Sequence, residues 1–234
     1  MWPCFFLSFL GGDTSSIYLR RLALNIGSSF FARNQDMGLY LLGVFGAYLL
    51  GSIPFGLIVS KIFGTDDPRT HGSRNIGFTN VLRVSGKRAG FLTLFGDLGK
   101  GFLATTMATL MGVPWSWILS IGLAVVLGHV FSIFLQFKGG KGVATAMGSI
   151  SGIHPLIGVV LMGVWLGTVL IFKYSSGGAL AAFGVFPFLA FFLTHDFYFC
   201  LYALCMMGII YLCHKENILR LIQGTENKMR LFSS

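Results

Sequence analysis

Residues 72–83 contain small polar side chains that could bind an anion. In chain order these are Gly72, Ser73, Asn75, Gly77, Thr79, Asn80 and finally Arg83. A glycine-rich backbone can turn its N–H groups inward as an anion-binding nest. The hydroxyl and amide side chains can donate further hydrogen bonds, and an arginine can grip a phosphate with two parallel ones. An ordinary polar turn is the alternative for this loop.

A second loop, residues 137–145, places glycines around a lysine directly before an apolar run. Gly139 and Gly140 precede Lys141, and Gly142 follows it. Free N–H groups and the positive end of the following helix would then face the same anion. The loop is not a Walker A loop, because no glycine stands at the required spacing before a Gly-Lys-Ser/Thr sequence. A flexible basic connection is the alternative, and the presence of two such loops weakens both alternatives.

His214 and Asn217 follow the last apolar run. At a spacing of three residues, both side chains can project from one face of a helix. An amphipathic helix that binds lipid headgroups is the alternative. It explains the neighbouring Lys215 and Arg220 better than it explains the histidine and asparagine pair.

Asp97 and Lys100 are charges inside an apolar segment. Such residues are costly within a membrane and are usually functional or paired. Their spacing lets them neutralise each other on one helix face, which we favour over direct contact with a substrate. His129 and His154 also lie in apolar surroundings, and we interpret them as packing or interfacial histidines.

The elements that must position these residues belong to a membrane protein. Of the 234 residues, 54% are hydrophobic and 11% are charged, and the mean hydropathy is +0.76. Soluble proteins carry roughly 25% charged residues, so the bilayer is the expected solvent of this chain. The net charge of +9 does not indicate nucleic acid, because the basic residues fall in short segments between apolar runs. The four cysteines show neither metal-ligand spacing nor a disulfide framework.

Apolar runs long enough to cross a bilayer predict an all-α, polytopic integral membrane protein. The runs cover residues 39–63, 89–111, 113–135, 143–172 and 178–213. The last two are too long for one span, and each contains a break, at His154-Pro155 and at His195-Asp196. Splitting there gives about seven spans. Of these, residues 143–153 are few enough for a half-helix or a re-entrant segment.

The distribution of lysine and arginine predicts the orientation in the membrane. One set of loops carries Arg69, Arg74, Arg83, Lys87, Arg88, Lys138, Lys141 and Lys173, and the tail adds Lys215, Arg220, Lys228 and Arg230. The opposite connections, near 112–114, 154 and 195–196, carry none. We therefore expect the basic loops, the C-terminus and the site to face the cytoplasm. The start of the first span should lie outside.

Residues 37–234 are expected to form a single membrane-embedded domain. Residues 1–36 contain Arg20, Arg21 and Arg33, which would lie outside, against the positive-inside bias. Their short apolar run lacks a cleavage site of small residues, so a signal peptide is only weakly indicated. Because Met37 directly precedes the first strong span, we interpret residues 1–36 as a dispensable N-terminal extension.

Together these motifs resemble the bacterial acyl-phosphate:glycerol-3-phosphate acyltransferases, the PlsY family. The matching segments are 51–56, 72–80, 97–101, 128–131, 138–142, 174–176 and 214–218. The resemblance implies a bacterial inner-membrane enzyme with seven spans that makes lysophosphatidic acid, 1-acyl-glycerol 3-phosphate, in phospholipid biosynthesis. One departure is Arg74, where members of the family commonly have glycine, and residues 1–36 have no counterpart.

The resemblance also carries functional positions onto this sequence. The family's phosphate-binding and active-site positions fall on Ser73, Thr79, Asn80, Arg83, Lys141, Ser176, His214 and Asn217. With the loops described above, the predicted catalytic residues are Ser73, Arg83, Lys141, His214 and Asn217. The predicted substrate-binding residues are Gly72, Asn75, Gly77, Thr79, Asn80, Gly139, Gly140, Gly142 and Ser176.

The implied chemistry fits these residue types. An acyl phosphate is a mixed anhydride that arrives activated, so no covalent enzyme nucleophile is needed. Positioning and electrostatic stabilisation can supply most of the acceleration. The loop cations and N–H groups would hold acyl phosphate and glycerol 3-phosphate. The spans would provide an apolar groove for the acyl chain. The proton acceptor is either His214 or the substrate phosphate. No cofactor, metal or nucleic acid is expected.

Other classes of function fit less well. Acyltransferases that use acyl-CoA or acyl carrier protein would show a His-x4-Asp pair, and none of the five histidines has an aspartate five positions on. CDP-alcohol transferases need clustered aspartates for a divalent metal, whereas the eight acidic residues here are scattered. A small transporter of phosphorylated metabolites suits the broken spans, but it predicts sites on both faces. A structural membrane subunit leaves the two glycine-rich loops unexplained.

Overall fold

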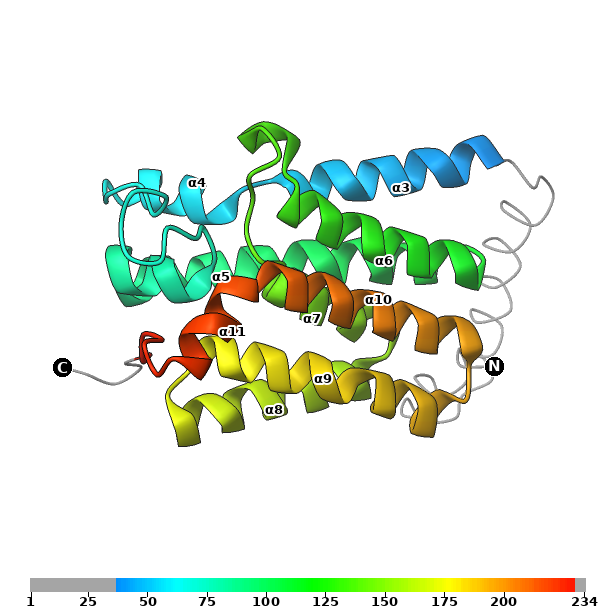
Figure 1. Ribbon diagram of the computed structural model, residues 1–234. Helices are drawn as coiled ribbons and strands as arrows, with labels where there is room; N and C mark the ends of the chain where they lie inside the picture. The colour runs from blue at the N-terminus through cyan, green and yellow to red at the C-terminus, as the bar shows by residue number, and fades with distance from the viewer. Residues whose placement is uncertain (1–36, 230–234) are drawn as a thin grey trace, which may run out of the picture.

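The computed structural model describes residues 37–229, and within this range no residue lies in a strand. The helices are α3 (Met37–Ser52), α4 (Phe55–Ile62), α5 (Phe78–Leu110), α6 (Trp115–Val130), the 3-10 turn η1 (Ile133–Leu135), α7 (Val143–Ile153), α8 (Pro155–Phe172), α9 (Ser175–Thr194), α10 (Phe197–Cys213) and α11 (Lys215–Ile222). Figure 1 shows the long helices side by side in one bundle. The prediction of an all-α fold is confirmed. The predicted N-terminal extension, residues 1–36, and Arg230 lie outside the described residues.

The two predicted helix breaks are confirmed. α7 ends at Ile153 and α8 begins at Pro155, with the ring of the intervening His154 accepting a hydrogen bond from the backbone N–H of Ile157. Proline is favoured in the first turn of a helix because its missing N–H would have no partner there. α9 ends at Thr194, and Asp196 caps α10 by accepting a hydrogen bond from the N–H of Phe199.

Among residues 37–229, four helical segments are long and apolar enough to cross a membrane: Met37–Ile62, Trp115–Leu135, Pro155–Phe172 and Ser175–Thr194. The pair Phe197–Cys213 and Lys215–Ile222, bent by 65°, makes a fifth if it is counted as one span. α5 is not among them, and α7 has the 11 residues expected of a half-helix rather than of a full crossing. The count of about seven spans therefore stays a prediction.

Two helices differ from the expected runs. The first run is interrupted at Ile53 and Pro54, which separate α3 from α4. α5 begins at Phe78, earlier than the apolar run beginning at residue 89, and contains Gly86 in a non-helical conformation with φ 85°. Only glycine adopts this conformation without strain, so the first two turns of α5 form a separate segment. This segment continues the polar loop that contains the predicted anion-binding residues.

The surface of the bundle is apolar, as expected for a protein in contact with lipid. Leu42, Phe95 and Phe188 on three different helices are each about two-thirds exposed. Such an exterior would be unusual in a soluble monomer. Inside, Phe183, Phe186 and other large side chains are fully buried.

Glycines bring α5 and α7 into direct backbone contact. A Cβ on Gly101 would overlap the carbonyl oxygen of Thr145, and a Cβ on Gly148 would overlap that of Leu98. Small residues allow this close approach of helices in membranes. The contact fixes the position of α7, and Lys141 lies two residues before its first helical residue.

Candidate active site

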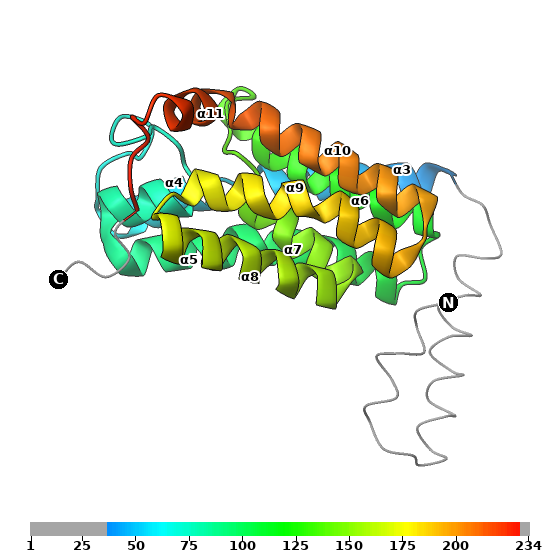
Figure 2. The same cartoon turned by 60° about the horizontal axis from the view of Figure 1, so that its bottom comes forward.

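The predicted site residues gather at one end of the bundle. The loop between α4 and α5, the start of α9, α11 and the C-terminal segment lie together at the left end of Figures 1 and 2. Because the two views agree, these segments from distant parts of the sequence are close in space. The side-chain contacts below describe how they meet.

Asn217 links the second loop to the C-terminal segment. Its side-chain oxygen accepts a hydrogen bond from the ammonium group of Lys141. Its amide nitrogen donates to Glu226 Oε1 at 2.6 Å. The asparagine is buried, at 5% exposure, so its amide has a fixed orientation. Burial lowers the pKa of Lys141, although the nearby carboxylate of Glu226 acts in the opposite direction.

Glu226 is held by three donors. Besides Asn217, Ser176 Oγ donates to Oε1 at 2.8 Å and Arg220 Nε donates to Oε2 at 2.7 Å. Burial favours a higher pKa for this carboxyl, but the hydrogen bonds from Asn217, Ser176 and Arg220 outweigh it, and the pKa lies below its ordinary value. We call Lys141, Ser176, Asn217, Arg220 and Glu226 the anion cluster.

Glu226 and Arg220 were not among the predicted site residues. Glu226 is the only acidic residue after Glu216 in an otherwise basic C-terminal segment, and this isolation was the available signal. The segment is anchored beyond it, since the backbone N–H of Met229 donates to the carbonyl of Lys173 at 2.6 Å. The Met229 side chain is buried against Phe78.

His214 lies at the edge of the anion cluster, between α10 and α11. Its Nδ1 is 2.8 Å from the carbonyl oxygen of Ile210. A carbonyl can only accept, so Nδ1 carries the proton and Nε2 keeps a free lone pair in the neutral ring. Burial, helped by the positive charge of Lys141, lowers the pKa of His214 to about 4. The imidazole is therefore neutral near pH 7.

Thr79 connects the first loop to the start of α9. Its hydroxyl lies 2.8 Å from that of Ser175, which is next to Ser176 in the anion cluster. Ser73 and Arg83 are exposed at the same end of the bundle. Among the described residues, the side chain of neither makes a hydrogen bond or ion pair, so both are available to an incoming ligand.

Asn80 was predicted to donate to a substrate, and in the structure its side chain donates inside the first loop instead. The residue is buried at 1% exposure, and its Oδ1 accepts from the N–H of Ser73 at 2.8 Å. Its amide nitrogen donates to the carbonyls of Pro68, His71 and Asn75. All its donors are used inside the loop, which makes Asn80 the residue that folds the loop.

Asn75 and the loop glycines also serve the fold of the first loop. The side chain of Asn75 accepts from the N–H of Gly77 at 2.8 Å, so neither this N–H nor the Asn75 side-chain oxygen is free. Gly72 has φ 62° and lies against the side chain of Asn80. Arg74, where the resembled family commonly has glycine, has φ 58°. This left-handed conformation favours glycine, which explains the family preference in physical terms.

The expectation of free N–H groups in the second loop is wrong for two of its glycines. The N–H of Gly139 donates to the carbonyl of Val130 at 2.9 Å, and the N–H of Gly140 donates to the main-chain carbonyl of His129 at 3.0 Å. These bonds satisfy carbonyls at the end of α6, which would otherwise lack partners. Gly142, with φ 80°, is the N-cap residue of α7. The side chain of Lys141 and the start of α7 are therefore the parts of this loop that are left to meet a ligand.

The predicted pairing of Asp97 with Lys100 is confirmed, at 2.9 Å in the interior of the bundle. His129 is more than a packing residue, because its Nδ1 lies 3.3 Å from Asp97 Oδ1 and 3.2 Å from the hydroxyl of Thr145. Within the described residues, no group of three or more His, Cys, Asp or Glu could hold a metal ion.

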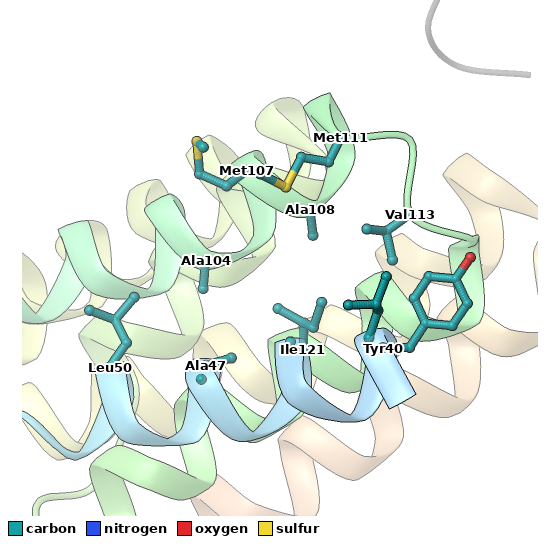
Figure 3. A pocket seen from close by; sticks show the side chains of 12 residues that line it. Tyr40, Ala47, Leu50, Ala104, Met107, Ala108, Met111, Val113 and Ile121 are labelled. Atoms are coloured by element: carbon teal, nitrogen blue, oxygen red, sulfur yellow. The ribbon is translucent and has the colours of Figure 1, made fainter. Parts of the chain in front are cut away.

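An apolar cavity of about 290 Å³ lies between α3, α5 and α6. Figure 3 shows Leu50, Ala104 and Met107 at one part of its wall and Tyr40 and Val113 at another. Its lining includes the first turns of α3 and the last turns of α5, so it lies toward the end of the bundle away from the anion cluster. It has room for hydrocarbon but does not touch the site.

The fold and the site define a helical membrane protein with a partly buried cluster of polar and charged side chains at one end. A family model described as glycerol-3-phosphate acyltransferase matches residues 41–224. This match covers more than half of the chain, and the chain belongs to this family.

Curated relatives support the same assignment. The chain is 42% identical over 184 residues to the glycerol-3-phosphate acyltransferase of Geotalea daltonii, covering 79% of this chain and 94% of the relative. It is 45% identical over 184 residues to that of Dechloromonas aromatica, covering 78% and 92%.

Two crystal structures are similar to this fold. Both are of PlsY, described as an integral membrane glycerol 3-phosphate acyltransferase, and both are 39% identical to this chain. The glycerol 3-phosphate form has a TM-score of 0.77 and covers 82% of this chain and 96% of that one. The lysophosphatidic acid form has a TM-score of 0.74, with coverage of 81% and 94%. The chain is therefore an integral membrane protein of this fold.

Proposed function

We propose that the chain transfers an acyl group from an acyl phosphate to the sn-1 hydroxyl of glycerol 3-phosphate, giving lysophosphatidic acid and phosphate. Family membership and the two ligand forms of PlsY support the acceptor and the product. One observation carries the proposal. Ser176 and Asn217 both donate to the carboxylate of Glu226, and Lys141 donates to Asn217 beside it. Donors that hold a carboxylate through charge-assisted hydrogen bonds can hold a phosphate in the same way.

The reaction needs two anionic substrates, acyl phosphate and glycerol 3-phosphate, held so that the sn-1 hydroxyl of one reaches the acyl carbonyl of the other. The sn-1 oxygen forms a bond to the acyl carbon, the bond from that carbon to the phosphate oxygen breaks, and phosphate leaves with the electron pair. Lys141 and Arg83 would hold the two phosphates, and the exposed hydroxyl of Ser73 and the Thr79–Ser175 pair would donate to their oxygens. Fixing both substrates in this way can replace much of the entropic cost of the bimolecular step.

His214 would orient glycerol 3-phosphate by accepting, on the lone pair of Nε2, a hydrogen bond from the sn-2 hydroxyl, which does not react. With a pKa of about 4, this imidazole is a poor general base near pH 7, since an efficient base has a pKa close to the working pH. We therefore assign the proton of the sn-1 hydroxyl to the departing phosphate. Asn217 would hold the Lys141 ammonium in place during the step.

The site is proposed to face the cytoplasm from a bacterial inner membrane. The lysines and arginines of the described loops lie on the connections at the end of the bundle that carries the anion cluster. The opposite connections have none, and this asymmetry favours a cytoplasmic position. Single cysteines at positions 70, 138 and 225, which are exposed, should react with membrane-impermeant reagents only from the cytoplasm. Labelling of position 138 from outside would contradict this orientation.

Residues 37–234 are proposed to be the whole catalytic unit, and residues 1–36 to be dispensable. The family match begins at residue 41, which supports this division. A chain that starts at Met37 should insert into the membrane and keep the activity of the full chain. Loss of activity at equal membrane levels would show that residues 1–36 are required.

The donor decides between this proposal and its alternatives. The purified full chain, supplied with labelled glycerol 3-phosphate, should form lysophosphatidic acid with a long-chain acyl phosphate and without divalent metal. Acyl-CoA and acyl carrier protein thioesters should give no product. Equal or faster use of a thioester would overturn the donor assignment. Uptake of glycerol 3-phosphate into vesicles without acyl transfer would favour the transporter alternative.

A further inference from the structure

A group of polar side chains lies inside the bundle, and the proposed reaction does not use it. Asp97, Lys100, His129 and Thr145 are each at most 4% exposed. The carboxylate of Asp97 is 2.9 Å from Lys100 Nζ and 3.3 Å from His129 Nδ1. We call these four residues the interior polar cluster. Buried charges are costly in a membrane protein and are usually functional or paired, so their contacts beyond the cluster are informative.

One arm of the interior polar cluster reaches the break between α3 and α4. Lys100 Nζ donates to the carbonyl oxygen of Ile53 at 2.9 Å. The end of a helix leaves carbonyls without partners and carries partial negative charge, so a lysine stabilises the break there. Beyond the break, Gly56 on α4 lies so close to the first loop that a Cβ would overlap the carbonyl oxygen of Ile76. Lys100 is thus connected through α4 to the loop that contains Ser73.

The other arm reaches the loop that contains Lys141. The Nε2 edge of the His129 ring lies against Gly140, because a Cβ added to Gly140 would overlap this ring nitrogen. The opposite edge of the ring faces Asp97 and the hydroxyl of Thr145 in the first turn of α7. The ring is therefore held between Asp97 and Gly140, the residue directly before Lys141.

We propose that Asp97, Lys100 and His129 are positioning residues that set the separation of the two loops expected to hold the substrate phosphates. This inference rests on the proposed function. His129 acts on Lys141 through Gly140, and Lys100 acts on the first loop through the break at Ile53. Misplacement of a reacting group by about 1 Å can cost up to about 10²-fold in rate, so a buried support of this kind has a measurable kinetic effect.

The test uses the contact between His129 and Gly140. Gly140→Ala introduces a methyl group against the imidazole and should lower kcat/KM for acyl transfer by about tenfold or more, because it moves Lys141. His129→Asn keeps an amide that can face Asp97 and removes the ring edge next to Gly140. Alone it should also lower kcat/KM, whereas the double variant should recover a substantial part of the activity lost in Gly140→Ala.

Two glycines provide matched controls. A methyl group on Gly139 would overlap the main-chain oxygen of His129, so His129→Asn should not restore Gly139→Ala. Gly163 has open space around its Cβ position, and Gly163→Ala should leave the kinetics unchanged. Wild-type kinetics for Gly140→Ala, or equal recovery of Gly139→Ala by His129→Asn, would overturn the proposal.

A merely structural role is separated by comparing kinetics with stability. The KM for each substrate and kcat are measured together with the melting temperature of each purified variant. The proposal requires kcat/KM of His129→Asn to fall at an unchanged melting temperature, and this variant decides the question if Gly140→Ala does not accumulate. A fall in melting temperature alone, with wild-type kcat and KM, would refute it. An inactive wild-type protein would instead overturn the proposed function itself.

Discussion

Lys141 offers the sharpest test of the anion cluster. Its ammonium group bonds Asn217, and the side chain is only partly exposed. Lys141→Met keeps most of the length and apolar stem of the side chain but removes the charge. The perturbation therefore isolates electrostatics from packing better than truncation to alanine would.

The magnitude follows from the proximity of charges. Two unit charges at about 4 Å interact by about 4 kcal/mol at an effective dielectric constant of about 20. The negative charge of Glu226 offsets part of this attraction in the same cluster. We expect a loss of about 2–4 kcal/mol in transition-state stabilisation, which corresponds to a fall of roughly 10²–10³ in kcat/KM.

The assay measures kcat/KM for acyl phosphate and for glycerol 3-phosphate in membranes with matched protein levels. Lys138→Met is the control, because Lys138 is an exposed lysine three residues earlier in the same loop. It should change kcat/KM by less than about threefold, in line with the small worth of an exposed charge. Near-wild-type kinetics for Lys141→Met would refute the assignment of phosphate binding to this lysine.

Three further predictions concern the surrounding charges and backbone. Arg83→Lys keeps the charge but loses the planar fork, so it should retain only part of the activity, and full activity would show that Arg83 makes no bidentate contact. The pKa of Glu226 lies below its ordinary value of 4.5, so its contribution to stability is present above about pH 4.5 and is lost as the pH falls through the lowered value. Glu226→Gln should remove this part of the acid dependence in a melting series, and an identical acid profile would contradict the geometry of the cluster. Arg74→Gly should relieve a left-handed arginine and raise stability by about 1 kcal/mol, roughly 2–4 °C in Tm, whereas a lower Tm would show that the arginine side chain stabilises the loop.

Local features of the sequence predicted much of this molecule. The breaks at residues 154 and 195–196 follow from a proline and from a short polar pair between apolar runs. The spacing of three residues between Asp97 and Lys100 was enough to predict their ion pair, because a helix places such residues on one face. The same argument placed Asn217 near the site, where it meets Lys141.

Features that depend on contacts between distant segments were not predictable from spacing. Glu226 enters the site because the C-terminal segment folds back to Lys173, and no local pattern indicates that return. His129 is an isolated histidine in an apolar helix, and only the packing of α5, α6 and α7 gives it partners. Asn80 was predicted to bind a ligand because its amide can donate either to phosphate oxygens or to carbonyl oxygens of the loop. Which of these two acceptors it meets depends on how the loop turns.

We propose that the acyl group passes directly between two substrates held together at the anion cluster. The most direct test incubates the purified full chain with a long-chain acyl phosphate and labelled inorganic phosphate, first without and then with glycerol 3-phosphate. Direct transfer predicts no label in the acyl phosphate without the acceptor, and one lysophosphatidic acid per phosphate released when the acceptor is present. Rapid exchange of label into the acyl phosphate in the absence of glycerol 3-phosphate would reveal an acyl-enzyme intermediate and contradict direct transfer.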